Sequence, residues 1–464
     1  MLKLITKIYA ILPVFIQNIL ISIYGFYWKK QRLGKEFHIS IPTYKQHEKF
    51  SKKQWNDYQT KELRKILIHA FTNVPYYKEK YRALGFTLKD FENFELNDLK
   101  RLPYLEKEDL RKYGTTTLLS NQRKKGKFIA SSGSTGTPTK IYFNKTFHQM
   151  WSAIYEVRVR NWAGVNYKMA RGMIGGRRIL PNAKAKAPYY RYNYFEKQTY
   201  FSAYHLSEKT VVNYVNGLQK NKVEYLVGYA MSIYFWADFI NQQKIKTPKL
   251  KAVLTSSEKL TTVMRITIEK AFQCKVYDGY SGVEACGMIS ENKYGELLFS
   301  ADTGIMEVVN ENGKDVAFGE TGEVIATGFL NYDQPLIRYR IGDNVQLAKD
   351  QSTKSNVNML KIDDIVGRIE DVIIGKDGRK MVRFHGLFVD IEGLKSAQII
   401  QHTLEDIEIK LVVQSKFDKT KEATITKRLE SQLEQLNITY TYVNNLPRTS
   451  NGKIKAVISN LIDF

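Results

Sequence analysis

Cysteine is nearly absent from this chain of 464 residues, which contains only Cys274 and Cys286. Two cysteines do not make a disulfide framework, and no group of cysteine and histidine has the spacing of a zinc site. These absences argue against a disulfide-stabilised secreted fold and a zinc-built fold. We expect both thiols to be reduced and buried, as is usual in a cytosolic protein. A chain of this length is long enough for two or three domains.

Acidic residues are in the minority: 47 Asp and Glu stand against 71 Lys and Arg, which gives a formal net charge of +24. A charge of this sign suits nucleic acid, an anionic membrane surface or an acidic substrate. The basic residues are spread along the whole chain, and the densest short run covers residues 123–127. We interpret most of them as solvated surface charges.

The chain also lacks a long, uninterrupted apolar run. Residues 8–28 carry no charge and are just long enough to span a bilayer, but polar and helix-breaking residues interrupt them: Pro13, Gln17, Asn18, Ser22 and Gly25. A basic run at 29–32, rather than a small-residue cleavage site, follows. Two interpretations remain for residues 1–36. We favour apolar helices packed on the main body; the alternative is a segment on the membrane surface with its lysines toward anionic headgroups.

The patterns that are present predict an α/β protein. Apolar runs at 223–227 and 250–254 are typical of buried parallel strands, and they alternate with amphipathic helical patterns such as 207–221. After residue 290, short strand patterns separated by Gly, Asn and Asp turns take over. We therefore predict a large α/β domain with several sheets over residues 1–367 and a small α+β domain over residues 368–464.

Residues 131–140, Ser-Ser-Gly-Ser-Thr-Gly-Thr-Pro-Thr-Lys, are the most informative stretch. Glycine lets the backbone turn so that N–H groups converge on one anion, and the hydroxyls and the lysine add donors and charge. Strand patterns at 127–130 and 141–143 flank the stretch, whose spacing is not that of a P-loop. We predict a phosphate-binding loop; the alternative is a solvated hairpin. The residues predicted to bind phosphate are Ser131, Ser132, Gly133, Ser134, Thr135, Gly136, Thr137 and Lys140.

Two later segments place aromatic and acidic side chains beside glycine turns. In residues 277–287, Tyr280 can stack on a base and Glu284 can hold Mg²⁺ through its oxygen atoms, and we expect a helix to begin near Val283. Asp343 follows Gly342 and can accept hydrogen bonds from a ribose. Ordinary turns with a buried tyrosine or a solvated acid explain the same residues.

Two further segments lie near the C-terminus: Gly-Arg-Ile-Glu-Asp at 367–371, and Lys453 directly after an Asn-Gly turn. Taken alone, Lys453 is best explained as an exposed lysine on a hairpin. The order of all five segments, however, resembles the adenylate-forming superfamily of acyl-CoA synthetases, adenylation domains and luciferases. Within it the chain is most similar to the phenylacetate–CoA ligase branch and to CapK-type capsular polysaccharide biosynthesis proteins, as segments 12–18, 73–77 and 201–207 also indicate.

Two positions depart from the superfamily's motifs. The glycine of its Tyr-Gly-x-Ser/Thr-Glu motif is displaced here to Gly282, in Tyr-Ser-Gly-Val-Glu. This loosens the assignment of Tyr280 as the platform for adenine. The hinge position, usually Asp or Lys, is Glu370.

The resemblance implies an enzyme that uses ATP to activate a small carboxylic acid as an acyl-adenylate. It then passes the acyl group to a thiol, such as coenzyme A, or to an amine. The 131–140 loop would hold the β- and γ-phosphates, Tyr280 the base, Glu284 the Mg²⁺, and Asp343 with Arg368 the ribose. Ser281 is also among the residues expected to bind the nucleotide. Lys453 would be the catalytic lysine, carried by a small domain that rotates about Glu370. The implied location is the cytoplasm, or peripherally the inner face of the membrane.

The acid pocket is predicted within residues 150–205, which are rich in aromatic residues and arginine. Such side chains suit a sugar acid, amino acid or aryl acid better than a fatty chain. The residues predicted to contact the acid are Trp151, Arg177, Tyr204 and His205. The competing hypothesis is a basic nucleic-acid- or membrane-binding protein with a decayed adenylation site. Because the lysines are dispersed, we expect no nucleic-acid partner.

Overall fold

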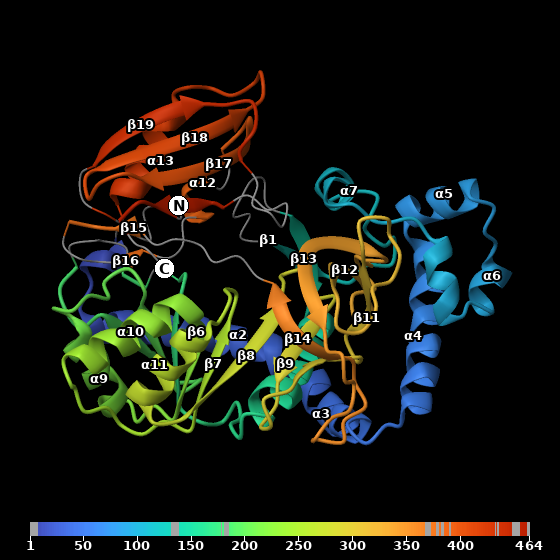
Figure 1. The fold of residues 1–464 in the computed structure, drawn as a ribbon, viewed down its shortest axis with the longest axis horizontal. Coiled ribbons are helices and arrows are strands. Elements are labelled where there is room, and N and C mark those ends of the chain that lie inside the picture. The colour runs from blue at the N-terminus through green and yellow to red at the C-terminus, as the bar shows by residue number, and fades with distance from the viewer. Residues whose placement is uncertain are drawn as a thin grey trace.

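The computed structural model describes residues 8–130, 139–177, 179–180, 185–366, 373–376, 380–381, 385–388, 391–431, 433, 436–447 and 455–461. Within these residues the largest sheet is mixed and has twelve strands (Figure 1). In spatial order they are β11 (Gly304–Val309), β12 (Thr321–Gly328), β13 (Tyr339–Leu347), β14 (Lys361–Val366), β10 (Leu297–Phe299), β9 (Met288–Glu291), β8 (Lys275–Ser281), β7 (Ala252–Ser256), β6 (Tyr225–Tyr229), β3 (Arg171–Gly175), β5 (Gln198–Ser202) and β4 (Tyr190–Asn193). The molecule is a mixed α/β protein, as the sequence predicts.

One half of this sheet is parallel, because β5, β3, β6, β7 and β8 run in the same direction. Leu226 and Val253 of the central strands pack with Trp236 in one apolar cluster, while their neighbours Tyr225 and Ala252 join a second cluster on the opposite face. The strands are therefore buried on both sides, which explains their continuous apolar sequence. The helices of the first cluster are α9 (Val211–Lys220), α10 (Ala230–Gln242) and α11 (Thr262–Phe272).

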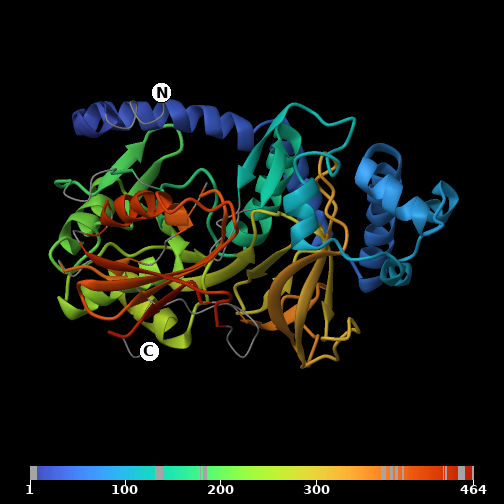
Figure 2. The same ribbon diagram turned by 90° about the horizontal axis from the view of Figure 1, so that it is seen from above.

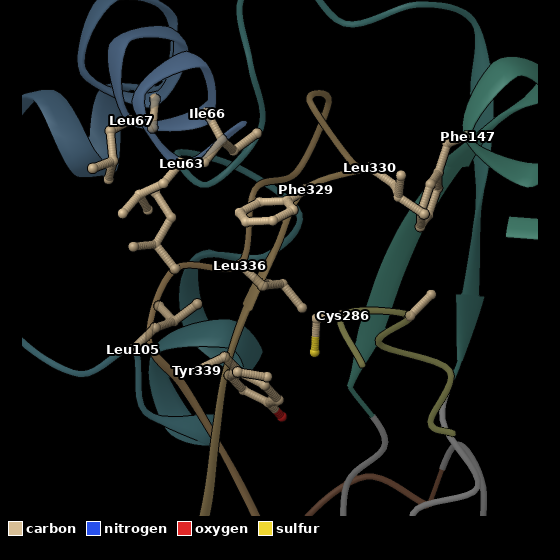
Figure 3. Close-up of a cluster of buried hydrophobic side chains, with 14 of the residues drawn as sticks. Leu63, Ile66, Leu67, Leu105, Phe147, Cys286, Phe329, Leu330, Leu336 and Tyr339 are labelled. Carbon is tan, nitrogen blue, oxygen red and sulfur yellow. The ribbon is translucent and has the colours of Figure 1, made fainter. Parts of the chain in front are cut away.

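The other half of the sheet, from β9 to β11, is antiparallel. An apolar cluster joins it to the N-terminal helices: Leu63 and Ile66 of α4 pack in one core with Leu336, Tyr339 and Cys286 (Figure 3). Helix α4 ends just before Pro75, which opens the next helix, as expected of a residue without an N–H group. The helices of this region are α3 (Lys35–His47), α4 (Lys52–Asn73), α5 (Pro75–Ala83), α6 (Leu88–Glu92), the 3₁₀ helix η1 (Leu96–Arg101), α7 (Lys107–Tyr113), α8 (Lys145–Ile154) and the π-helical η2 (Tyr155–Asn161).

A buried ionic network fixes α3 and η2 to the connection between β10 and β11. The guanidinium of Arg158 donates to Asp302 at 2.5 Å, to Glu48 at 2.7 Å and to the carbonyl of Tyr44 at 2.8 Å. Asp302 also contacts Nδ1 of His47 at 2.5 Å. Arg158 and Asp302 are both fully buried, so each charge depends on its partners.

The N-terminal helix α2 (Val14–Arg32) lies along the sheet edge formed by β4 (Figure 2). It packs against β4 and α8. Among the described residues, no helix is both long enough and apolar enough to cross a membrane.

The C-terminal residues form a separate sheet with its own core. Ile399, Ile409 and Leu411 of this sheet pack against Ile425 and Leu429 of a helix. The elements are β15 (Ile373–Ile374), β16 (Lys380–Met381), α12 (His385–Phe388), β17 (Leu394–Gln401), β18 (Asp406–Val413), α13 (Lys421–Glu430), β19 (Asn437–Tyr442) and β20 (Val457–Ser459), with the four-stranded order β19-β18-β17-β20. The domain boundary at residue 367 stays a prediction, because residues 367–372 lie outside the described part.

Candidate active site

Two paired strands flank the predicted phosphate loop in the sequence. β1 (Gly126–Ala130) and β2 (Lys140–Asn144) form an antiparallel hairpin whose last pair is Ala130 with Lys140. The two strands expected around the loop are therefore present, and they bring its ends together. Residues 131–138, and with them Ser131, Ser132, Gly133, Ser134, Thr135, Gly136 and Thr137, lie outside the described residues. Lys140 opens β2 and is exposed.

The C-terminal end of this loop contacts the predicted magnesium ligand. Thr139 is fully buried, and its hydroxyl donates to Oε1 of Glu284 at 3.2 Å. Glu284 lies in the short connection between β8 and β9, where the sheet changes from parallel to antiparallel. Two motifs separated by 145 positions in the sequence thus meet at one carboxylate. The sequence analysis did not single out Thr139, although it belongs to the loop motif.

The expected helix beginning at Val283 is wrong, because a tight turn stands there and is followed by β9. The N–H of Ala285 donates to the carbonyl of Gly282 at 3.2 Å, and Ala285 has a φ of +48°, which no helix accommodates. Ala285 and Cys286 belong to the apolar core that joins the sheet to α4, in which Figure 3 labels Cys286. Burial raises the pKa of the Cys286 thiol well above its usual value, so it remains a protonated core residue.

The displaced glycine of this motif has a steric role. A Cβ added at Gly282 would lie 2.5 Å from Oε2 of Glu284. Glycine at this position therefore leaves room for the carboxylate to fold back over the turn.

Tyr280 and Asp343 are joined directly. The hydroxyl of Tyr280, on β8, donates to Oδ2 of Asp343, on β13, at 2.9 Å. Three strands, β9, β10 and β14, separate β8 from β13 in the sheet. In a flat sheet four strand spacings would place the two backbones about 19 Å apart. The sheet must therefore curve strongly here.

The environment of Tyr280 keeps its hydroxyl protonated. Burial, the negative charge of Asp343 and the hydrogen bond to that carboxylate all raise the pKa of Tyr280 well above its usual value. The adjacent Ser281 is exposed at the end of the strand. Gly342, just before Asp343, has a φ of +80°, a conformation that favours glycine.

Asp278, which the sequence analysis did not single out, has a perturbed environment close to Tyr280. It belongs to the same motif as Tyr280 and accepts hydrogen bonds from Thr255 Oγ1 and from the N–H of Gly279, both at 3.0 Å. Burial raises the pKa of Asp278 to about 7, against the opposing effect of these donors. This acid lies in the middle of β8, where it pairs with Thr255 of β7. The only sequence signal was its place within the motif.

Three of the four predicted acid-pocket residues lie together at the ends of β3 and β5. Tyr204 Oη donates to the carbonyl of Gly176 at 3.2 Å, next to Arg177. Exposed Arg177 donates to Tyr200 Oη at 3.2 Å. His205 is buried, and its Nδ1 lies 2.7 Å from Ser202 Oγ.

Trp151, the fourth predicted pocket residue, lies on α8 and packs against the core that contains α4. Other polar residues in the 150–205 region are also structural. Arg158 belongs to the buried network, and Arg160 pairs with Glu156 at 2.9 Å. Arg158 and Arg160 of this region are therefore engaged in ion pairs within the protein, and counting arginines overestimates how many can contact a ligand.

Arg368, Glu370 and Lys453 lie outside the described residues. Their predicted roles in ribose binding, domain rotation and catalysis stay predictions.

This architecture is that of a known class of enzymes. Two solved structures of 2-hydroxyisobutyryl-CoA ligase, one with R3-HIB-AMP and one with 2-HIB-AMP and CoA, match with TM-scores of 0.56 and 0.55. Each covers 89% of this chain and 91% of its own, at 17% sequence identity. The fold is that of the adenylate-forming CoA ligases.

Sequence comparison adds particular relatives. Protein CapK of Staphylococcus aureus is 28% identical over 99% of this chain and 100% of its own length. The phenylacetate-coenzyme A ligase of Escherichia coli is 26% identical over 68% of this chain and 71% of its own length. The phenylacetate-coenzyme A ligase of Thermus thermophilus is 22% identical over 86% of this chain and 95% of its own length. The CapK C-terminal domain family matches residues 373–460. The resemblance to the phenylacetate–CoA ligase branch and to CapK is thus confirmed.

Proposed function

We propose that this chain is an ATP-dependent, AMP-forming carboxylate ligase. The observation that carries the proposal is the meeting of separate motifs at one place: Thr139 on Glu284, and Tyr280 on Asp343. The fold shared with CoA ligases, and relatives named as phenylacetate-coenzyme A ligases, support the same conclusion. These contacts favour a working site over the hypothesis of a decayed one.

In the first half-reaction a carboxylate oxygen of the acid attacks the α-phosphorus of ATP. The bond to the bridging oxygen of the β-phosphate breaks, and pyrophosphate leaves. In the second, a thiol or amine attacks the acyl carbonyl, loses its proton and releases AMP. Since little bond chemistry falls to the protein, catalysis depends on positioning and on neutralising charge. Relatives named as CoA ligases favour coenzyme A as the acceptor.

The residues around Glu284 fit a magnesium ion. Mg²⁺ prefers oxygen ligands and is usually held by one or two carboxylates together with substrate phosphates. Glu284 supplies a carboxylate, and its contact with Thr139 supports a position close to the predicted phosphate loop. Glu284 would thus hold the ion, whose charge would offset that of the phosphates.

The remaining roles follow the same arrangement. Asp343 would accept from the ribose hydroxyls, with Arg368 beside it, while Lys453 would neutralise the charge that develops between carboxylate and α-phosphate. Arg177 and Tyr204 would receive the acid, which we infer to be a sugar acid, amino acid or aryl acid. Similarity to CapK supports a role in capsule or surface polysaccharide synthesis. Use of ATP and coenzyme A would favour a reaction in the cytoplasm.

The test is hydroxylamine trapping of acyl-adenylates, with pyrophosphate exchange into ATP, across a library of sugar, amino, aryl and fatty acids. Lys453→Ala should lose about 100-fold or more of the exchange rate, because it removes a contact with developing charge. Lys395→Ala, an exposed lysine of the same C-terminal region, is the matched control and should retain the rate. No exchange with any acid, or an unimpaired Lys453→Ala variant, contradicts the proposal.

A further inference from the structure

Helix α2 has its polar side against the protein and its apolar side in solvent. The side chains that it buries are small or polar: Gln17, Ser22 and Gly25. Its exposed side carries large apolar residues, with Phe15 exposed by 64% and Ile23 by 59%. In an ordinary surface helix of a globular protein the apolar residues face the core. Helix α2 shows the opposite arrangement, so both its buried polar side and its exposed apolar side require a physical reason.

The polar side is explained by the strand beneath it. β4 is the edge strand of the large sheet, and an edge strand presents unpaired backbone groups. Asn18 Oδ1 accepts the N–H of Tyr192 at 2.9 Å, and Ser22 Oγ accepts the N–H of Tyr194 at 3.0 Å. At Gly25 the helix approaches so closely that a Cβ would lie 1.9 Å from Asn193 Nδ2. The buried side of α2 is polar because it caps a sheet edge.

The exposed side continues onto the turn after β4. The ring of Phe26 lies 4.9 Å from that of Phe195, centre to centre, and both rings are exposed. The outer surface of α2 and this turn thus form one apolar surface, which we call the α2 face. Its members are Phe15, Ile19, Leu20, Ile23, Tyr24, Phe26, Tyr27, Tyr194 and Phe195.

The charges beside the α2 face are positive. Lys30 Nζ lies 4.4 Å from the centre of the Phe26 ring, and Lys127 Nζ lies 3.7 Å from that of Trp28. The sequence contains no acidic residue before Glu36. The nearby carboxylate of Glu196 is buried and paired with Arg32 and Arg171. An apolar surface with a cationic border matches the interface of an anionic bilayer.

We propose that the α2 face binds the surface of an anionic lipid bilayer, with α2 parallel to the membrane plane. The apolar side chains enter the boundary between headgroups and acyl chains, and Lys30 and Lys127 face the headgroup charge. A second copy of the chain is a poorer occupant, because pairing two α2 faces would bring their cationic borders together. This inference goes beyond the proposed function and does not depend on it.

The test is sedimentation of the full-length protein with phosphatidylcholine vesicles that contain or lack phosphatidylglycerol. Binding should require the anionic lipid and weaken as salt rises. Phe15→Ser/Ile23→Ser should reduce partitioning about 10-fold or more, because it removes two large apolar side chains from the α2 face. The matched control is Val263→Ser/Ile266→Ser on α11, a helical pair exposed by 65% and 61%, which should bind like the wild type.

A second variant guards against misfolding of the first. Lys30→Glu/Lys127→Glu leaves the apolar residues in place and should still lower binding to anionic vesicles, since each basic residue near the surface strengthens it about five-fold. Absence of binding to anionic vesicles overturns the proposal. Equal binding of the wild type and both variants to anionic vesicles also overturns it. A dimer in solution that Phe15→Ser/Ile23→Ser abolishes would instead identify a second copy of the chain as the occupant of the α2 face, and would likewise overturn it.

Discussion

Replacing Gly282 by alanine tests whether the turn at Glu284 serves the chemistry. A Cβ at this position would lie 2.5 Å from Oε2 of Glu284, whereas ordinary contacts begin at 3.4 Å. The carboxylate must therefore move by about 1 Å. A displacement of this size in a group that positions substrate can cost about 10²-fold in rate. We expect that loss in pyrophosphate exchange, together with a higher magnesium requirement.

Gly279→Ala is the matched control, because a Cβ there would meet its nearest atom, the carbonyl oxygen of Thr255, at 3.6 Å. Both variants should melt near the wild-type temperature, since the displaced carboxylate is a flexible side-chain end. In a Glu284→Ala background, which has no carboxylate to displace, Gly282→Ala should cause no further loss. A Gly282→Ala enzyme with normal exchange, or an additive loss in the double variant, refutes the reasoning.

Two further outcomes follow from the same site. Tyr280→Phe removes the donor to Asp343, a bond to a charged acceptor worth about 1.5–3 kcal/mol. It should raise the KM for ATP about 10-fold and leave that for the acid unchanged, while the exposed Tyr294→Phe should alter neither; an unchanged KM for ATP contradicts the assigned geometry. For Asp278, folding raises the pKa from 3.8 to about 7, so the folded state binds more protons between these pH values and stability falls as pH rises through them. Asp278→Asn should abolish this component of the fall, as followed by melting temperature against pH; parallel curves for wild type and variant would contradict it.

The parallel half of the sheet was predictable because its signals are local. Apolar runs at 223–227 and 250–254 appear as β6 and β7 shifted by about two residues, since the runs fix the strands but not their ends. Pro75 marks a helix boundary through its own missing N–H. The strands β1 and β2 around the predicted phosphate loop were also predictable from local sequence, because short apolar runs flank a stretch rich in Gly, Ser and Thr.

Other features depend on contacts that no short segment encodes. The false helix at Val283 satisfied local propensity, but Ala285 adopts a left-handed conformation and Cys286 joins a core supplied by distant residues. The bond from Tyr280 to Asp343 requires a curvature set by three intervening strands. The polar residues within the apolar stretch 8–28 counted against a membrane span. Only the structure shows that two of them, Asn18 and Ser22, accept hydrogen bonds from the backbone of β4 and the turn after it. Composition placed Trp151 in the predicted acid pocket, and the structure adds that its partly buried side chain packs against the core around α4; its role in the pocket stays a prediction.

The Tyr280–Asp343 bond also bears on the order in which the chain matures during synthesis. Tyr280 emerges from the ribosome 63 residues before its partner, and both come long after the hairpin around residue 131. Until β13 is made, the nascent chain contains Tyr280 and Glu284 but lacks the strand that carries Asp343, so the curved part of the sheet cannot form. Any stabilisation that a bound nucleotide gives through this part of the site can therefore act only after about three quarters of the chain has been made.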